Sequence, residues 1–198
     1  MTGEDSRRAN EHAPHATARS GERLPPVVRS FVDDHPAGRA LDVATGTGRN
    51  ALVLAERGWT VDAVDISSAQ LTRARERAAD RSVTVNWILA DVDSYGFPDG
   101  VYDLVTVRFF DARNRLPALI ASLAPGGVLW YEHYLESPAG ESGPGDSYRF
   151  EPNELLTACS ALTILYYAEY RVDGEPRVTL VARNEDDVSR WRPQLSPD

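Results

Sequence analysis

The chain contains no lysine: its 21 basic residues are all arginines, set against 30 acidic residues, with a formal net charge of −9. Nucleic-acid binding needs a concentrated positive surface that this composition does not supply, so we expect no nucleic-acid partner. An acidic, lysine-free surface suits a host with a salty interior, but a GC-rich genome also favours arginine. Those two explanations stay open.

Cysteine and long apolar runs are scarce as well. Cys159 is the only cysteine, which excludes an internal disulfide and agrees with a reducing compartment. It lies in a helical pattern, and we expect a buried small apolar side chain rather than a nucleophile. No stretch approaches the roughly 18 consecutive apolar residues of a membrane span. We therefore expect a soluble, cytoplasmic protein without a membrane partner; its oligomeric state is left open.

The length of 198 residues suits one α/β domain rather than two. Residues 1–21 are polar and carry two histidines with no third ligand at metal-site spacing. We expect them to form a disordered tail, neither a signal peptide nor a metal site. We expect the domain to occupy residues 22–184 and a second tail to occupy residues 185–198.

Apolar segments alternate with helical patterns through most of the chain. Runs rich in Val, Ile, Leu and aromatic residues predict five strands, at 39–45, 60–66, 83–89, 102–109 and 128–134. Apolar residues at helical spacing lie between them, and a further helix is expected at 25–33. This alternation predicts an α/β fold, a doubly wound, mostly parallel sheet.

The end of the chain has a different pattern. Two more strand-like runs, 163–172 and 177–183, flank a short Asp-Gly turn and predict a C-terminal antiparallel hairpin. The sheet should then have seven strands. A glycine- and proline-rich insertion at 136–148 follows the fifth strand, where a loop covering a ligand is expected.

Two glycines, Gly46 and Gly48, follow the first strand in the stretch LDVATGTGRN. In a doubly wound sheet the ligand crevice lies beyond the carboxyl ends of the strands. Glycines there let bare backbone bend tightly and approach a ligand. Asp65 ends the second strand, where a carboxylate can accept both ribose hydroxyls, and Asp91 follows the third, where it can accept from an adenine amino group. Each acid alone can cap a helix instead, but together they favour an adenosine site.

Two cofactor chemistries compete at this turn. Gly46, Gly48 and Ala51 also satisfy the dinucleotide fingerprint G-x-G-x-x-[GA]. Asp42, a carboxylate in mid-strand beneath the turn, favours a cofactor with a positively charged group over a dinucleotide. Its burial is costly without a positive or hydrogen-bonding partner. A methionine-type ammonium is such a partner.

With these residues assembled, the sequence resembles the class I methyltransferases that use S-adenosylmethionine. The acid and glycines of DVATGTG, the acids Asp65 and Asp91, the LAPGGVLWYE turn and the terminal hairpin carry the resemblance, which covers residues 22–184. The first motif looks especially like that of the small tellurite-resistance-type methyltransferases, with Thr45 as a departure. The resemblance implies a Rossmann-like fold and cofactor contacts at Asp42, Ala44, Gly46, Gly48, Asn50, Asp65, Ile66, Asp91, Val92 and Arg108.

The resemblance does not identify a substrate, but two residues are candidates for catalysis. Arg108, at the end of the fourth strand, can pair with the cofactor carboxylate or an anionic substrate, or form a structural ion pair with Asp91 or Asp111. His133, at the end of the fifth strand, can remove a proton near neutral pH or be structural.

We therefore expect an enzyme that transfers a methyl group from S-adenosylmethionine to a small-molecule acceptor, with a thiol or a reduced chalcogen as one candidate. A nicotinamide-dependent oxidoreductase and a non-catalytic nucleoside-binding domain are the alternatives.

Overall fold

A computed structural model of the chain describes residues 24, 26–136 and 145–185. The strands are β1 (Arg39–Val43), β2 (Thr60–Asp65), β3 (Asn86–Leu89), β4 (Tyr102–Arg108), β5 (Leu123–Tyr134), β6 (Thr163–Val172) and β7 (Glu175–Arg183). The helices are α1 (Pro26–Asp34), α2 (Arg49–Ala55), α3 (Ser68–Asp80), α4 (Leu116–Ala121) and α5 (Glu154–Ala158), with short 3₁₀ turns at Arg113–Arg115 and Asp146–Tyr148.

The expected tails lie outside the described residues, apart from residue 185. Most of the insertion at 136–148 also lies outside them. The division of the chain into a domain at 22–184 and two tails therefore stays a prediction.

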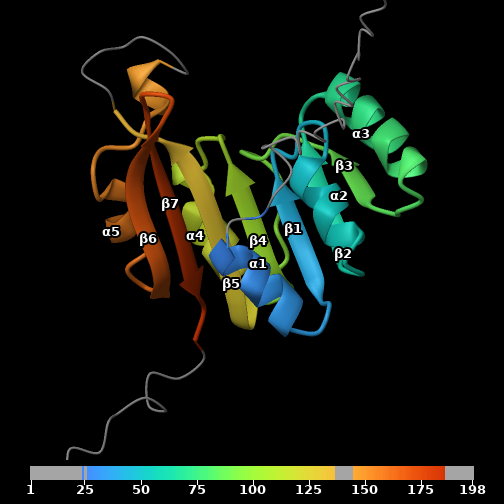
Figure 1. The fold of residues 1–198 in the computed structure, drawn as a ribbon, viewed down its shortest axis with the longest axis horizontal. Helices are drawn as coiled ribbons and strands as arrows, with labels where there is room; N and C mark the ends of the chain where they lie inside the picture. Colours follow the sequence, from blue (N-terminus) through green and yellow to red (C-terminus); the bar gives the residue numbers. More distant parts are fainter. Residues whose placement is uncertain (1–23, 25, 137–144, 186–198) are drawn as a thin grey trace, which may run out of the picture.

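The seven strands form one sheet in the order β3-β2-β1-β4-β5-β7-β6 (Figure 1). Strands β1 to β5 are parallel, whereas β7 runs antiparallel to both β5 and β6. The predicted fold class is confirmed. The strand order reverses between β1 and β4, and such a switch point opens a crevice at the carboxyl ends of its two strands.

The C-terminal hairpin turns at Asp173 and Gly174, whose φ angles are 51° and 83°. Two consecutive positive φ values match a two-residue turn whose twist suits a hairpin, as the Asp-Gly pair predicts. The largest differences from the expected strand boundaries are at the starts of β5 and β3. Strand β5 begins at Leu123, which pairs with Tyr102, and β3 begins only at Asn86 because its pairing with β2 starts there.

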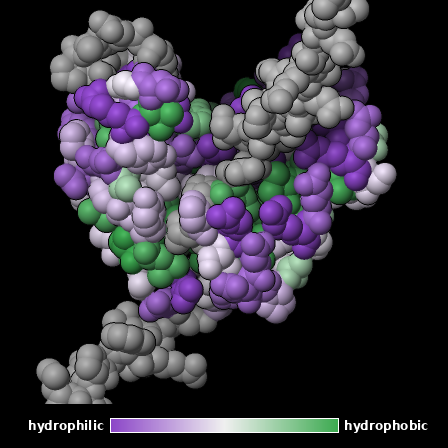
Figure 2. All heavy atoms as spheres, viewed as in Figure 1, coloured by the Kyte–Doolittle hydropathy of each residue, from purple (hydrophilic) through white to green (hydrophobic). Residues whose placement is uncertain are grey.

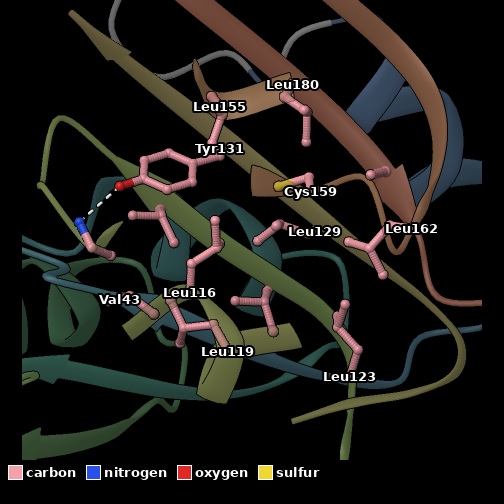
Figure 3. Packing of buried hydrophobic residues seen from close by; sticks show 14 of the residues in the cluster. Val43, Leu116, Leu119, Leu123, Leu129, Tyr131, Leu155, Cys159, Leu162 and Leu180 are labelled. Atoms are coloured by element: carbon pink, nitrogen blue, oxygen red, sulfur yellow. Dashed lines mark hydrogen bonds between the residues drawn. The ribbon is translucent and has the colours of Figure 1, made fainter. Parts of the chain in front are cut away.

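Helices cover both faces of the sheet. Helices α1 and α2 pack on one face, over an apolar cluster that includes Leu54 and Trp130, and α4 and α5 pack on the other (Figure 1). A second apolar cluster lies beneath α4 and α5, and it contains Cys159 and Leu155 (Figure 3). The side chain of Cys159 is fully buried, as predicted, and burial raises the pKa of its thiol to about 12.

The surface shown in Figure 2 is mainly hydrophilic, with apolar side chains gathered in smaller patches between the polar ones. Within the part of the chain that the structure describes, no helix has the length and apolarity that crossing a membrane would need. Those same residues contain no group of three or more His, Cys, Asp or Glu side chains that could hold a metal ion.

Candidate functional site

A cleft of about 1080 Å³ opens at the switch point of the sheet. Its walls come from the ends of β1, β4 and β5, from the start of α1, and from the hairpin β6–β7. Ligand pockets range from roughly 300 to 1,000 Å³, so this cleft is at the upper end of that range.

The turn between β1 and α2 forms one end of the cleft. Gly46 and Gly48 have φ angles of 57° and 76°. A Cβ atom added to Gly46 would meet nothing within 4 Å, whereas one added to Gly48 would lie 2.7 Å from the Trp87 ring and 3.2 Å from the Ala74 Cβ. Gly46 therefore borders open space in the cleft. Gly48, which does not line it, is required by packing against α3 and β3.

Asp42 lies beneath this turn with an exposed fraction of only 1%. Its carboxylate accepts hydrogen bonds from the Thr106 hydroxyl (2.6 Å), the Asn50 amide (3.3 Å), the Ala51 N–H (3.2 Å) and the Thr45 hydroxyl. Burial raises the pKa of Asp42, and these hydrogen bonds oppose the rise. The chain's own donors thus supply the compensation that the sequence analysis assigned to a ligand ammonium.

A row of polar side chains crosses the sheet from Asp42 to the hairpin. Asn50, which donates to Asp42, accepts from Arg108 Nη1 at 3.4 Å. Arg108 Nε in turn donates to Glu132 Oε2 at 2.7 Å. The Tyr170 hydroxyl donates to Glu132 Oε1 at 3.2 Å and lies 3.0 Å from the Thr179 hydroxyl. We call this hydrogen-bonded chain the polar row.

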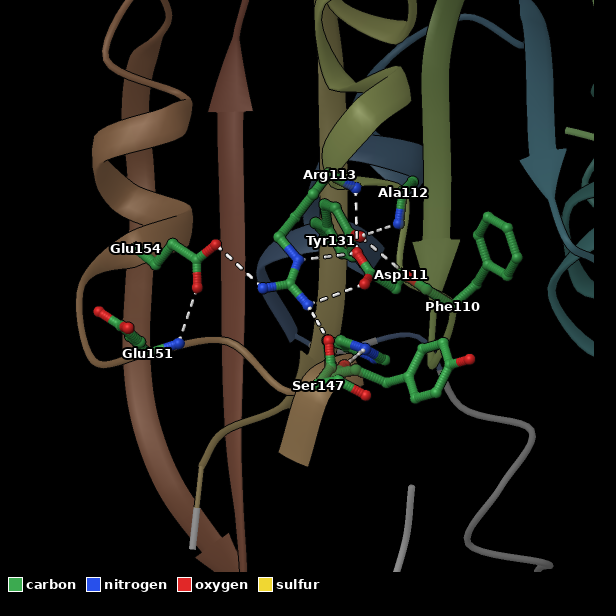
Figure 4. Close-up of polar contacts among 10 residues, drawn as sticks. Phe110, Asp111, Ala112, Arg113, Tyr131, Ser147, Glu151 and Glu154 are labelled. Carbon is green, nitrogen blue, oxygen red and sulfur yellow. Dashed lines mark hydrogen bonds and ion pairs between the residues drawn. The ribbon is translucent and has the colours of Figure 1, made fainter. Parts of the chain in front are cut away.

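The polar row follows from strand register. Arg108 pairs with Glu132 across β4 and β5, and Glu132 pairs with Thr179 across β5 and β7. Paired residues of neighbouring strands point to the same face of a sheet. Arg108 is thus confirmed at the end of its strand, but its structural partner is Glu132. Of the alternatives left open for Arg108, a structural ion pair does form, but with Glu132, whereas Asp111 pairs with Arg113 (Figure 4).

Three of the predicted cofactor residues, Asp65, Ile66 and Asp91, lie at the ends of β2 and β3, outside the lining of the cleft. Asp65 accepts from the N–H groups of Gly46 (2.7 Å) and Ser67 (2.8 Å) and so ties the turn to β2. Ile66 is 68% exposed, and Asp91 is exposed with one carboxylate oxygen accepting from Asp93 N–H.

Val92 and His133 have buried side chains that do not line the cleft. Val92 packs in the apolar cluster beneath α4 and α5. His133 faces that same side of the sheet, where its ring contacts Phe150 edge-on at 5.5 Å between centroids. Its Nε2 lies 2.7 Å from the Tyr148 carbonyl, as suits an N–H donor, and its Nδ1 has no hydrogen-bond partner among the described residues. Burial lowers the pKa of His133, an effect that the bond to Tyr148 opposes.

Comparison with known proteins relates the central part of the chain to methyltransferases. Residues 40–127, from β1 into β5, match the family model described as a methyltransferase domain.

The methyltransferases that the chain resembles are named for different acceptors. The demethylmenaquinone methyltransferase of Thermus thermophilus is 39% identical over 112 residues, which are 53% of this chain and 51% of the relative. The malonyl-[acyl-carrier protein] O-methyltransferase of Serratia marcescens is 29% identical over 83% of this chain and 67% of its own length. The chain therefore spans only about half to two thirds of these relatives. TehB from Haemophilus influenzae shares the fold, with a TM-score of 0.69, 19% identity, and coverage of 82% of this chain and 63% of TehB.

Among the cleft residues that the sequence did not predict are Glu132, Tyr134, Tyr170 and Arg177. Strand alternation contained the signal for two of them. Successive residues of a strand point to opposite faces, so Glu132 and Tyr134 share the side opposite His133. The two hairpin residues depend on the pairing of β7 with β5, which the sequence does not specify.

Proposed function

We propose that the protein transfers a methyl group from S-adenosylmethionine to a small molecule, with the cofactor lying along the β1–α2 turn and the ends of β2 and β3. The observation that carries the proposal is the open space beside Gly46, next to a carboxylate at the end of β2. When bound, the cofactor supplies an electrophilic methyl group on a positively charged sulfur.

The adenosine part fits the ends of β2 and β3. Each Asp65 oxygen accepts one backbone N–H, and because a carboxylate has about four acceptor sites, about two remain for ribose hydroxyls. Ile66 and Leu89 are 68% and 58% exposed, and apolar surface of this kind is suited to a flat base. Asp91 is placed to accept from the base, and Val92, whose side chain is buried, is left to contribute its backbone N–H.

The methionine part fits the cleft end formed by Asp42, Ala44, Gly46, Asn50 and Arg108. Asp42 already accepts four hydrogen bonds from the protein, so we assign it to holding Asn50 and the turn in place. Ala44 is a non-glycine residue with a φ of 51°. Such strained backbone clusters at ligand sites, and here it directs the turn toward the cleft. Gly48 contributes by letting α2 start against Trp87.

The residues of the cleft serve mainly to align the reacting groups. Well-oriented neighbours reach effective molarities of roughly 10⁵ M or more, so alignment and exclusion of water supply much of the catalysis without a metal or a triad. A readily ionised acceptor, such as a thiol or a reduced chalcogen, needs no strong general base. The side chain of His133 lies on the face of the sheet opposite the cleft. Its role in proton removal stays a prediction.

Calorimetry with S-adenosylhomocysteine, the demethylated cofactor, tests the proposal. We expect micromolar binding to the wild-type protein and at least tenfold weaker binding to Asp65→Ala. Asp93→Asn is the matched control, because it removes an exposed carboxylate near Asp91 and should leave the affinity within twofold.

Absence of binding to the wild-type protein would end the proposal. A rise in melting temperature with a nicotinamide cofactor, and none with S-adenosylhomocysteine, would favour the oxidoreductase instead. Cofactor binding with no consumption in the presence of thiol, metalloid or small-acid acceptors would favour the non-catalytic nucleoside-binding domain.

A further inference from the structure

Arg177, on β7, is a cation with few partners at the far end of the cleft. Its nearest carboxylate oxygen, Glu132 Oε1, lies 3.9 Å from Nη1, beyond hydrogen-bonding distance. Among the residues that the structure describes, its Nε is buried with no hydrogen-bond partner. The side chain keeps 23% of its surface exposed and lines the cleft. A guanidinium has five N–H donors, and the four on its two Nη atoms can serve a ligand in the cleft.

Two aromatic rings hold the Arg177 guanidinium. Its Cζ lies 5.1 Å from the centroid of Phe109 and 5.7 Å from that of Tyr134, and the two rings are 5.0 Å apart. Phe109 adopts a φ of 54°, a strained conformation for a bulky side chain. Backbone strain of this kind persists where the surroundings enforce it, commonly at ligand sites. Phe109 is thus fixed with its ring 37% exposed beside the cation.

The nearby negative charge is already neutralised. Both oxygens of Glu132 are engaged, Oε2 by Arg108 at 2.7 Å and Oε1 by the Tyr170 hydroxyl at 3.2 Å. Asp173, at the hairpin turn, is exposed, so water and salt screen it. Arg108 and Arg177 thus share the single carboxylate of Glu132, at 2.7 and 3.9 Å, and together keep an excess positive charge that an anion can neutralise.

Arg177 lies on the acceptor side of the cleft. The sheet order places β4 and β5 between β1 and β7. Neighbouring strands are about 4.8 Å apart, so Arg177 is displaced from the Gly46 turn by about 14 Å across the sheet. The cofactor proposed above occupies the ends of β1 to β3. Its methionine end reaches β4, which leaves Arg177 to the second ligand.

We propose, on the basis of the proposed function, that the methyl acceptor is a planar organic anion whose negative group binds Arg177 and whose ring or conjugated plane packs on Phe109 and Tyr134. Tyr166, on β6, is 43% exposed and also lines the cleft. The two carboxylate oxygens of such a ligand match the planar fork of the guanidinium.

The test uses three naphthalene probes that share one ring and differ in charge: 2-naphthoate, neutral 2-naphthamide and cationic 2-naphthylmethylamine. Calorimetry is carried out on the full chain saturated with S-adenosylhomocysteine. We expect the naphthoate to bind at least tenfold more tightly than either other probe. In Arg177→Met that preference should fall to less than twofold, while Arg177→Lys should keep part of it.

Arg183→Met is the matched control, because Arg183 lies on the same strand at the opposite end of the sheet, outside the cleft. It should keep the wild-type preference. The affinity for S-adenosylhomocysteine should stay within threefold in every variant. If Arg177→Met fails to fold, the wild-type charge series and Arg177→Lys still decide.

Tighter binding of the amide or the amine, or no binding of the naphthoate, would overturn the inference while leaving the proposed function intact. A loss of S-adenosylhomocysteine affinity in Arg177→Met would also overturn it, by assigning Arg177 to the cofactor. Failure of the wild-type protein to bind S-adenosylhomocysteine would remove the proposed function, and this inference with it.

Discussion

Strand β5 separates two regions that are built from adjacent residues but differ in character. On one side, Glu132 and Tyr134 face the open cleft and belong to a line of charged and aromatic groups. On the other, Tyr131 and His133 pack against Phe150 in a closed core. Among the described residues of β5, the polar side chains that can reach a ligand in the cleft lie on the face covered by α1 and α2.

Polar groups on the closed side are used for structure. Arg113 donates to both oxygens of Asp111 and also pairs with Glu154 at 3.2 Å (Figure 4). The Tyr131 hydroxyl accepts from Ala112 N–H at 2.8 Å and donates to a backbone carbonyl at 2.9 Å. These bonds join the loop after β4 to β5 and α5. On the closed side these polar groups bond to one another instead of to water. On the cleft side several N–H donors are left for a ligand.

The largest expected effect comes from breaking the polar row. Glu132→Ala leaves Arg108, whose side chain is only 19% exposed, without its carboxylate. Removing one partner of a buried ion pair costs about 3 kcal/mol or more, and we expect a loss near that value in urea unfolding. Glu136→Ala, an exposed position just beyond β5, is the control. A loss below about 1 kcal/mol would mean that the pair acts like an exposed one.

Two glycine substitutions compare packing with ligand access at one turn. Gly46→Ala and Gly48→Ala both place a side chain at positive φ, which costs about 1 kcal/mol or more. Only Gly48→Ala also drives a Cβ against Trp87, so we expect it to lower the melting temperature further. Gly46→Ala should instead weaken S-adenosylhomocysteine binding more than tenfold. The reverse order of effects would show that the cofactor does not contact Gly46.

The smallest expected effect lies on the closed side, in His133→Gln. Burial lowers the pKa of His133 in the native protein below its ordinary value of 6.5. The unfolded chain then binds its proton more readily, so the free energy of unfolding falls as the pH drops below 6.5. Gln can keep the bond to the Tyr148 carbonyl but cannot titrate. Unfolding measured from pH 7.5 to pH 5 should therefore show a weaker acid destabilisation in His133→Gln.

Activity assays of the same variant separate two interpretations of His133. If His133 is structural, kcat of His133→Gln should keep the wild-type dependence on pH. Loss of the acidic limb of that profile would instead support the predicted role in proton removal.

The strands and the hairpin could be predicted because their signals are local. Alternating apolar runs mark β1 to β5, and the Asp-Gly pair marks the turn between β6 and β7. The acids and glycines near the switch point could also be predicted, since they follow strands directly. The partner of Arg108 could not, because it depends on the register between β4 and β5. Arg177 was missed for the same reason, since an antiparallel strand returns it to the crevice from far along the chain.

The alternation of β5 has a further consequence for how this protein can change over evolution. Deleting one residue between Val128 and Glu132 would exchange the two sides, bringing His133 into the cleft and the Glu132 carboxylate among apolar side chains. A substitution along this strand changes one side chain, whereas a change in its length moves every residue beyond it to the other face. Insertions should instead accumulate at the exposed Asp173–Gly174 turn, where extra residues alter the reach of the hairpin and leave every pairing of β5 intact.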